Sequence, residues 1–316
     1  MDVLSEILGA LRLRGTLYFS TEFRKPWGLR VPELGRVARF HLVLRGSTWV
    51  VVQGQREPVL LEPGDLILVP HGAEHKLADD PTTPCRSVDE VVQAAGFTGR
   101  GALVYGGEDT GAPTKLICGH FAFDEGVQHP LLTQLPPALV VRWDEAMRDS
   151  PLEGVFRFIT REVTEHQPGH ETVVQRLSEV LFVQVVRVWA SRSVPDQGML
   201  AALADPRLGD ALTAIHEQPA ARWTLETLSR RAAMGRSAFA ERFHDVVGVT
   251  PLQYVTLWRM QDAKRLLTES QLSLEQISER VGYDSGASFS RVFTKTTGRT
   301  PGAYRRATRS GGGLSS

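Results

Sequence analysis

The chain has few cysteines and no long run of apolar residues, and these shortages exclude several classes of protein. Two cysteines among 316 residues, Cys85 and Cys118, are too few for a disulfide framework. No run of about 18 apolar residues is present, so the sequence predicts no membrane-spanning helix. The N-terminus carries acids early and lacks a small-residue cleavage site, which argues against a signal peptide. We therefore expect a cytoplasmic protein.

The chain also lacks a net charge, but its charges are unevenly distributed. It holds 36 basic and 36 acidic residues. From Leu200 onward there are 16 basic and 11 acidic residues, so the C-terminal part is basic and the N-terminal part acidic. This asymmetry is typical of a nucleic-acid-binding module joined to a domain of another kind.

A repeated pattern fills the last hundred residues. Leu225–Tyr254 matches Leu274–Tyr304 at an offset of 49 in the first half and 50 in the second. Each copy indicates a helix, a tight turn and a second helix, which is the helix-turn-helix pattern, over 225–246 and 274–297. The second helix of such a unit usually enters a DNA major groove. An ordinary all-α bundle with an old duplication is the alternative, but it does not explain why both turns, both phenylalanine pairs and both Gly-x-Thr-Pro exits recur.

Two phenylalanines in each copy fix which side of the second helix faces outward. Phe239 and Phe243 lie one helical turn apart, as do Phe289 and Phe293, and should pack on the first helix. At about 100° per residue the other side is then free to meet DNA. The candidate DNA-binding residues are Arg236, Ser237, Ala240, Glu241, His244, Gly286, Ala287, Ser290, Arg291, Thr294 and Lys295.

Side-chain chemistry assigns roles to some of these residues. Arg291 is the expected base reader, because arginine bonds guanine in bidentate fashion. Glu241 can accept from cytosine or hold a neighbouring arginine. Lys295, Arg299 and Arg305 are expected to contact phosphates.

Thr250-Pro251 predicts the start of a helix between the two units, because threonine caps and proline suits the first helical position. This connecting helix is predicted to span about 18 residues, or roughly 27 Å at ~1.5 Å per residue. Successive major-groove faces lie ~34 Å apart. The two second helices can therefore reach adjacent grooves on one side of the duplex.

Residues from Pro206 to Arg306 resemble the AraC/XylS family of bacterial transcription regulators. The resemblance is carried by the double unit and by Gly282–Arg305, which is similar to the family's signature region. It implies DNA binding by two helix-turn-helix units, usually as a dimer on promoter sites. The outward face of the first recognition helix is poor in long polar side chains, so we expect DNA shape to share the task of recognition.

Short β-strands are predicted before this region. Their β-branched runs, separated by glycine-containing turns, indicate a small barrel or sandwich. The runs are Ala38–Leu44, Thr48–Val52, Pro58–Leu61, Leu66–Val69 and Leu116–Phe123. The intervening segment from Ala78 to Lys115 holds three prolines and six glycines and is predicted to be a long loop.

Glu62–His75 resembles the second half-motif of the cupin superfamily. The resemblance implies that His75 points into the barrel and that His41 stands where metal-binding relatives carry a ligand. The whole N-terminal half is similar to the cupin-type domain of an AraC-type subgroup that includes oxidant-responsive regulators. Two imidazoles are too few for a closed zinc site, so His41 and His75 are candidates for a metal ion and no cofactor is assigned.

Cys118 and Cys85 are candidate effector or redox residues. His120 lies close enough in sequence to lower the pKa of the Cys118 thiol, which favours a redox switch or a soft-metal ligand. A buried structural cysteine is the alternative.

Helical periodicity begins after Pro137. Leu152–Glu165 and Thr172–Ser191 are the predicted helices, and the second has an apolar arc wide enough to pack on the barrel or form a dimer interface. The fold class is therefore α+β, with an N-terminal cupin-like barrel and a C-terminal all-α domain. The predicted domains are a sensor over 1–132, a helical extension over 133–192, a linker over 193–202, a DNA-binding domain over 203–307 and a flexible tail over 308–316.

Together these features predict a DNA-binding transcription regulator, and not an enzyme, whose barrel senses a small molecule, metal or oxidant. Its expected partners are double-stranded promoter DNA, a second copy of the chain, an unknown effector and RNA polymerase. A metal-dependent cupin enzyme fused to a DNA-binding domain is the alternative. A constitutive DNA binder whose barrel merely dimerises is a further one.

Overall fold

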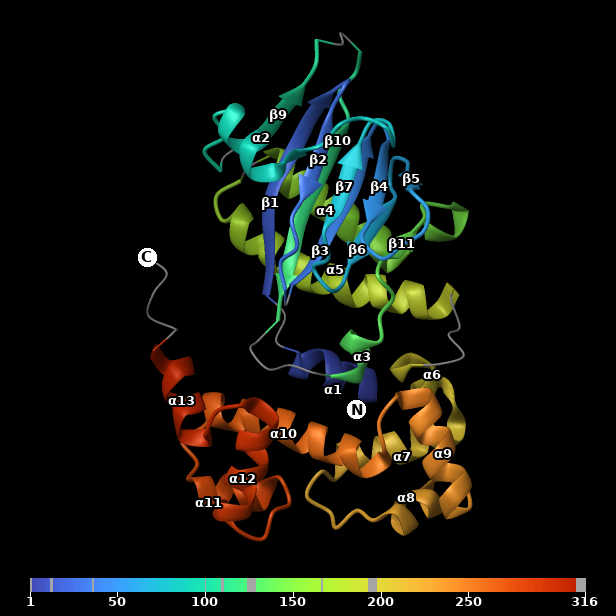
Figure 1. The fold of residues 1–316 in the computed structure, drawn as a ribbon, viewed down its shortest axis with the longest axis vertical. Helices are drawn as coiled ribbons and strands as arrows, with labels where there is room; N and C mark the ends of the chain where they lie inside the picture. Colours follow the sequence, from blue (N-terminus) through green and yellow to red (C-terminus); the bar gives the residue numbers. More distant parts are fainter. Residues whose placement is uncertain are drawn as a thin grey trace. The chain divides into compact units, whose positions relative to one another are not determined.

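The computed structural model describes residues 2–11, 14–35, 37–99, 101–108, 111–123, 129–165, 167–192 and 198–310. The chain divides into two compact units (Figure 1). The barrel unit comprises Leu13–Glu125 and Leu135–Val194. The helical unit comprises Met1–Arg12, Gly126–Gln134 and Pro195–Ser316. No helix in the described part of the chain is long and apolar enough to cross a membrane.

Two β-sheets form the barrel unit, and the predicted α+β class with a cupin-like barrel is confirmed. One sheet has the order β11-β6-β3-β10-β1-β9 and the other β5-β4-β7-β2-β8. The strands of the first sheet are β1 (Arg14–Arg24), β3 (Val37–Arg45), β6 (Leu66–Val69), β9 (Ala102–Gly106), β10 (Lys115–Ala122) and β11 (Leu139–Val141). Those of the second are β2 (Gly28–Val31), β4 (Thr48–Val52), β5 (Val59–Leu61), β7 (His75–Ala78) and β8 (Arg86–Ser87).

Alternation along β3 and β10 separates the barrel interior from the face that the helices cover. The strands are antiparallel, with His41 opposite Cys118. Val43 and Cys118 belong to the core between the sheets. Phe40, which lies between Arg39 and His41 on β3, stacks on Phe121 outside the barrel, with ring centroids 5.1 Å apart. Because side chains in a strand alternate between faces, this register directs His41 and Arg39 inward.

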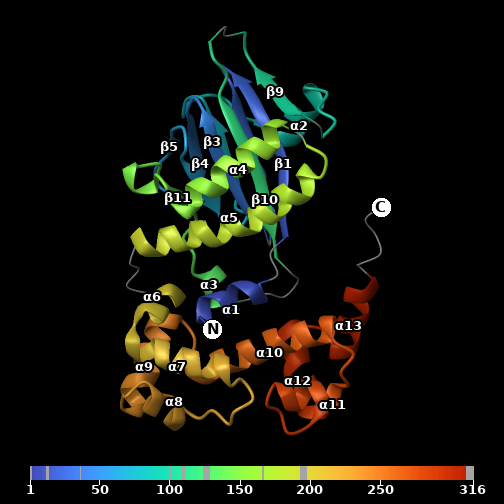
Figure 2. The same ribbon diagram turned by 180° about the vertical axis from the view of Figure 1, so that it is seen from behind.

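Two helices lie across the outer face of the six-stranded sheet (Figure 2): α4 (Pro151–Glu165) and α5 (His170–Arg192). Both predicted helices are thus confirmed. Phe182 of α5 meets Phe121 of β10 edge to face, at a centroid distance of 5.2 Å. The apolar face of α5 therefore packs on its own barrel, through Val174, Leu181, Phe182, Val185 and Val186.

The predicted long loop over residues 78–115 is wrong in part. This segment contains β8, α2 (Val88–Ala94) and β9, and β9 pairs in parallel with β1. The short apolar stretch of α2 buries Val91 in the barrel core. Such short elements are held by tertiary packing, which leaves little periodicity in the sequence.

The helical unit is built from short helices around one long one. They are α1 (Val3–Ala10), α3 (Pro130–Thr133), α6 (Met199–Ala204), α7 (Pro206–Glu217), α8 (Leu225–Arg231), α9 (Arg236–Val247), α10 (Pro251–Glu269), α11 (Leu274–Arg280), α12 (Gly286–Thr297) and α13 (Pro301–Ser310). The two predicted helix-turn-helix units correspond to α8–α9 and α11–α12, and the connecting helix to α10.

Local signals in the sequence set the ends of these helices. Thr224, Thr250 and Ser273 each form a capping box at a helix start, the last with Gln276 as predicted. Gly248 and Gly298 end α9 and α12 in the left-handed conformation, with φ of 78° and 74°, where glycine is favoured.

The structure changes several predicted boundaries. Residues 1–12 and 126–132, assigned to the sensor, and residues 133–134, assigned to the helical extension, belong to the helical unit. Helix α1 packs on α7 and α10 there, and α3 packs on α6. Helix α6 occupies part of the predicted linker, whose residues 193–197 lie outside the described residues. Helix α13 runs into the predicted tail, of which residues 311–316 lie outside the described residues.

Candidate nucleic-acid interface and barrel pocket

The phenylalanine anchors pack inside each helix-turn-helix unit as the sequence predicts. Phe239, Phe243, Phe289 and Phe293 are all 0% exposed. The rings of each pair lie 5.6 Å and 5.5 Å apart. Each anchor therefore fixes the rotation of its recognition helix, α9 or α12, and decides which residues face outward.

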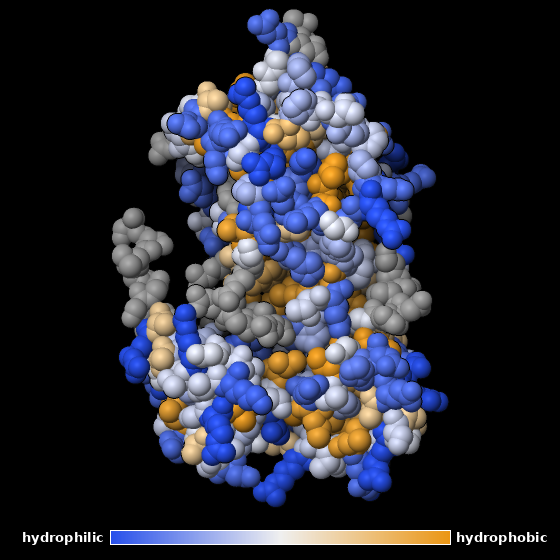
Figure 3. Space-filling view, viewed as in Figure 1, coloured by the Kyte–Doolittle hydropathy of each residue, from blue (hydrophilic) through white to orange (hydrophobic). Residues whose placement is uncertain are grey.

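The eleven predicted DNA-binding residues lie on the surface side of these helices. Arg236, Ser237, Glu241, His244, Ala287, Arg291 and Lys295 are exposed, and Ala240, Gly286, Ser290 and Thr294 are half-buried. In the space-filling view hydrophilic side chains dominate the surface over α8, α11 and α12 (Figure 3). The outer faces of α9 and α12 can therefore meet the base edges and phosphates of a duplex.

Arg305 does not have its predicted phosphate role in this conformation. Its guanidinium donates to the carbonyls of Leu267 and Leu272, at 3.3 Å and 2.7 Å. It therefore holds α13 against the end of α10. Arg299 and Lys295 are exposed.

Arg259 of α10 connects the two helix-turn-helix units. Its Nε and Nη2 donate to the carbonyls of Pro219 and Ala221 beside the first unit, at 2.7 Å and 2.8 Å. Its Nη1 donates to the carbonyl of Gly282 in the second unit at 3.0 Å. One guanidinium thus bonds segments about 60 residues apart in sequence, because its donors form a rigid planar fork.

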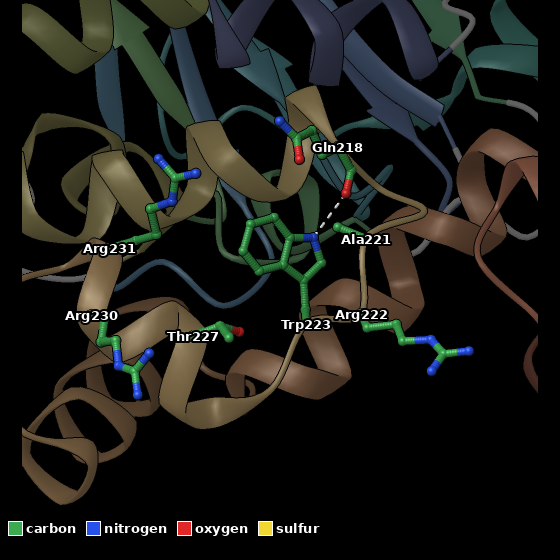
Figure 4. Close-up of a pocket in the computed structure, with 7 residues that line it drawn as sticks. All are labelled: Gln218, Ala221, Arg222, Trp223, Thr227, Arg230 and Arg231. Atoms are coloured by element: carbon green, nitrogen blue, oxygen red, sulfur yellow. Dashed lines mark hydrogen bonds between the residues drawn. The ribbon is translucent and has the colours of Figure 1, made fainter.

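A basic hollow beside the first unit was missed by the sequence analysis. It encloses about 460 Å³ and is lined by Gln218, Ala221, Arg222, Trp223, Thr227, Arg230 and Arg231. The indole of Trp223 lies in its middle and donates to the carbonyl of Gln218 at 2.8 Å, with the arginines around it (Figure 4). The sequence signal was the cluster of three arginines around the start and end of α8.

In the barrel, His41, His75 and Cys118 meet across the two sheets. His75 Nδ1 lies 2.8 Å from the carbonyl of Ala73, so it must donate there. Burial lowers the pKa of His75 to about 4, so the ring is neutral and its Nε2 accepts. His41 Nε2 lies 2.8 Å from that nitrogen and therefore donates to it.

The direction of these hydrogen bonds fixes the protonation state of Cys118. With Nε2 donating, the Nδ1 of a neutral His41 is an acceptor, and Cys118 Sγ lies 3.1 Å from it. Burial lowers the pKa of His41 well below its usual range and raises the pKa of Cys118 to about 12. Cys118 is therefore a thiol that donates to His41, and a single backbone carbonyl orients all three side chains.

A pocket of about 410 Å³ lies beside this chain. It is lined by Phe19, Leu29, Val31, Pro32, Arg39, His41, Val88, Asp89, Val92, Phe97, Gly99, Cys118 and Gly119. Its volume falls within the range of roughly 300–1,000 Å³ of small-molecule sites, and its lining is mostly apolar with a few polar groups. The elements that form it are β1, β2, β3 and β10, with α2 at its edge.

Comparison with known proteins places this geometry in a family. A cupin family model matches residues 2–191, and a helix-turn-helix domain model matches residues 228–307. An AraC-like transcription regulator of Streptomyces lividans is 34% identical over 97% of this chain and 98% of its own.

The chain belongs to the AraC-like transcription regulators.

Two further relatives of this regulator match along almost their whole length. An HTH-type transcriptional regulator of Haemophilus influenzae is 30% identical over 97% of this chain and 99% of its own. The RCS-specific HTH-type transcriptional activator RclR of Escherichia coli is 28% identical over 98% and 99%. The regulator is thus a DNA-binding protein with a cupin barrel, as the sequence predicts.

The predicted redox residues of the regulator lie in surroundings unlike those of reactive cysteines, which are partly exposed and have a lowered pKa. Cys118 is 2% exposed, and burial raises its pKa. Burial and Arg39 lower the pKa of His120, so that imidazole is neutral and brings no positive charge. Burial also raises the pKa of Cys85, which is half-buried. The redox role stays a prediction.

The donor set of the regulator's barrel does not fit a metal ion in this conformation. His41 and His75 bond each other through the nitrogens that would bind the ion. In the described part of the chain no group of three or more His, Cys, Asp or Glu side chains is arranged to hold a metal. A metal at His41 and His75 would require this hydrogen bond to break.

Proposed function

We propose that this regulator places α9 and α12 in successive major grooves of promoter DNA and that an effector in the barrel pocket changes its DNA affinity. The observation that carries the proposal is the pair of outward faces held over fully buried anchors. Helix α10 has 19 residues, or roughly 28 Å at ~1.5 Å per residue. This length suits the ~34 Å repeat of the groove.

The basic hollow around Trp223 supplies phosphate contacts in this proposal. In helix-turn-helix proteins the first helix crosses the DNA backbone, and α8 is the first helix here. Arg231 is exposed at the end of α8, whereas Arg230 pairs with Glu226. Arg231, Lys295 and Arg299 are therefore the expected phosphate-binding side chains.

The regulator acts as a homodimer in this proposal. Helix α5 buries one face against the barrel, and its other side carries Leu177, Val180 and Val188, with Val180 43% exposed. Val180→Glu is expected to shift sedimentation from dimer to monomer.

RNA polymerase is the protein partner of a regulator bound at a promoter. Such a partner requires the compartment that holds the genome, the cytoplasm.

The test begins with selection of a binding site from random duplex DNA by the purified protein. Arg291→Ala is expected to weaken binding to the selected site by about 1–3 kcal/mol and to relax the sequence preference at one position. Arg207→Ala, exposed on α7 outside the proposed contacts, is the matched control. Equal affinity of wild type and Arg291→Ala for the selected site would remove Arg291 from base reading. A protein that selects no sequence at low salt would contradict the proposal.

The barrel serves as a receptor in this proposal rather than as a metal enzyme. The mutual bond of His41 and His75 and the regulator names of the relatives support this assignment. Elemental analysis of the purified protein is the test. Stoichiometric zinc or iron that disappears in the His41→Ala/His75→Ala variant, together with turnover of a small molecule, would favour the enzyme.

A further inference from the structure

The barrel pocket combines an apolar lining with one buried positive charge. Phe19, Leu29, Val31, Val92 and Phe97 supply apolar walls. Arg39 also lines the pocket and is 5% exposed. Its Nη1 donates to the carbonyl of Pro32 at 2.5 Å, which fixes the guanidinium at the wall. A charge held in such a place acts through a low dielectric and is felt strongly by anything that enters.

The neighbouring polar groups do not compete with Arg39 for a ligand. Both nitrogens of His41 are engaged, one by His75 and the other by Cys118. The Cys118 thiol donates its hydrogen bond to His41. Asp89, on α2, is the carboxylate among the described lining residues, and it is exposed to solvent, which screens its charge. Arg39 is therefore the buried cationic side chain among the lining residues that the structure describes.

The inward histidines respond to this charge. Arg39 contributes to the lowered pKa of His41, His75 and His120, in each case beside the larger effect of burial. All three groups point into the barrel from β3, β7 and β10. The positive charge of Arg39 is therefore felt by inward groups on three strands.

We infer that the effector of this regulator is a small organic acid, with its carboxylate at Arg39 and its apolar body against Phe19, Phe97 and Val92. Guanidinium binds carboxylates through two parallel N–H···O bonds, which gives both energy and orientation. An apolar body of modest size suits a pocket of about 410 Å³. This inference rests on the proposed function, because it names the ligand class of the same pocket.

Two neighbouring strands of the six-stranded sheet, β1 and β10, line the pocket. Phe19 lies on β1, and Cys118 and Gly119 lie on β10. A side chain at Gly119 would collide with Phe40 at 2.6 Å, so this part of β10 is closely packed.

The test compares acids with their uncharged counterparts. Calorimetric titration of the full-length protein uses 3-phenylpropionate and octanoate, each beside its primary amide. An acid is expected to bind about tenfold to a hundredfold more tightly than its amide, the range expected of a hydrogen bond to a charged group. Arg39→Met is expected to abolish this preference, whereas Arg45→Met, exposed on the same strand, is expected to preserve it. Phe19→Trp, which fills the pocket, is expected to weaken acid and amide alike.

Several results would overturn the inference. They are equal binding of acid and amide, an unchanged preference in a folded Arg39→Met protein, and no binding of either acid at millimolar concentration. If Arg39→Met does not fold, the acid–amide comparison on wild type and on Phe19→Trp decides alone. Parallel titrations of DNA affinity separate the two claims. An amide that changes DNA affinity as strongly as its acid overturns the acid class and leaves the proposed function. Acid preference without any change in DNA affinity supports the acid site and contradicts the effector part of the proposed function.

Discussion

At the scale of single residues, hydrogen-bond direction decides the chemistry of the barrel. The carbonyl of Ala73 sets the tautomer of His75, which sets that of His41, which leaves Cys118 to donate. None of these three side chains needs to be charged for the hydrogen bonds to form. These hydrogen bonds and burial together keep Cys118 in its thiol form.

The reactivity of Cys118 is the first residue-scale prediction. With its pKa raised to about 12, the thiolate at pH 8 is roughly 10³-fold scarcer than for an ordinary cysteine of pKa about 8.5. Iodoacetamide should therefore modify native Cys118 slowly, with a rate that rises tenfold per pH unit through pH 10. Mass spectrometry with Cys118→Ser as the control measures this rate. Fast modification at neutral pH would revive the redox switch.

Arg231 is the second residue-scale prediction. Arg231→Ala should weaken binding to all duplex sequences about equally and reduce the salt slope of log K by about 1, because one phosphate contact is lost. Fluorescence anisotropy across a salt series measures the slope. Arg207→Ala, an exposed arginine on α7, is the matched control. An unchanged slope would remove the hollow around Trp223 from the DNA interface.

At the scale of elements, the two helix-turn-helix units are independent in sequence but share one connector. Each has its own buried phenylalanine pair, joined by Tyr254 in the first unit and Tyr304 in the second. The caps at Thr224, Thr250 and Ser273 set where helices begin. The relative position of the two helix-turn-helix units depends on α10 and on its half-buried Arg259.

Removal of Arg259 tests whether the two units must be held together. Arg259→Met keeps the length of the side chain but loses the three bonds to Pro219, Ala221 and Gly282. We expect a loss of roughly 2 kcal/mol of stability in the helical unit and at least a tenfold loss of affinity for a site that engages both units. Urea unfolding and anisotropy measure the two effects. Arg265→Met, on the surface of the same helix, should leave both unchanged.

At the scale of the whole molecule, buried neutral histidines occur in both units. In the helical unit Leu131 N–H donates to His129 Nδ1 at 3.1 Å, so His129 Nε2 faces the Tyr254 hydroxyl as a donor at 3.4 Å. That hydroxyl lies 2.9 Å from His216 Nε2, and His216 Nδ1 lies 3.1 Å from Glu6. These hydrogen bonds tie α1 and α3 to α7 and α10 through two histidines that are neutral in the folded protein.

Acid should therefore destabilise the protein. Burial lowers the pKa of His129 and of His216 to about 3, and that of His75 to about 4. Above pH 6.5 the folded and unfolded states bind equal numbers of protons at these rings. Below it the unfolded state binds more, so stability falls with decreasing pH by up to about 1.4 kcal/mol per unit for each ring, until the folded pKa is reached.

Circular dichroism between pH 7 and pH 4 measures this loss. His129→Phe should flatten the pH dependence by the contribution of one ring. Equal pH dependence of wild type and His129→Phe would show that folding does not lower the pKa of His129.

The sequence by itself determined helices α8 to α12 to within a few residues, because capping boxes, the glycines that end α9 and α12, and the phenylalanine pairs are local signals. It also determined strands β3, β4, β5, β6 and β10 through β-branched runs, and the face of each recognition helix through the anchors. The candidate DNA contacts Arg236 to Lys295 lie on the surface for that reason.

Tertiary structure alone decided the rest, since each feature joins residues far apart in the chain. Residues 1–12 and 126–134 join the helical unit because α1 and α3 find their apolar partners there, and α2 and β9 are held by packing in a segment without periodicity. His41 lies 34 residues from His75 and 77 residues from Cys118 in the sequence. Their hydrogen bonds, and the burial of Arg39 beside them, depend on the register of strands from two sheets, which no local pattern encodes.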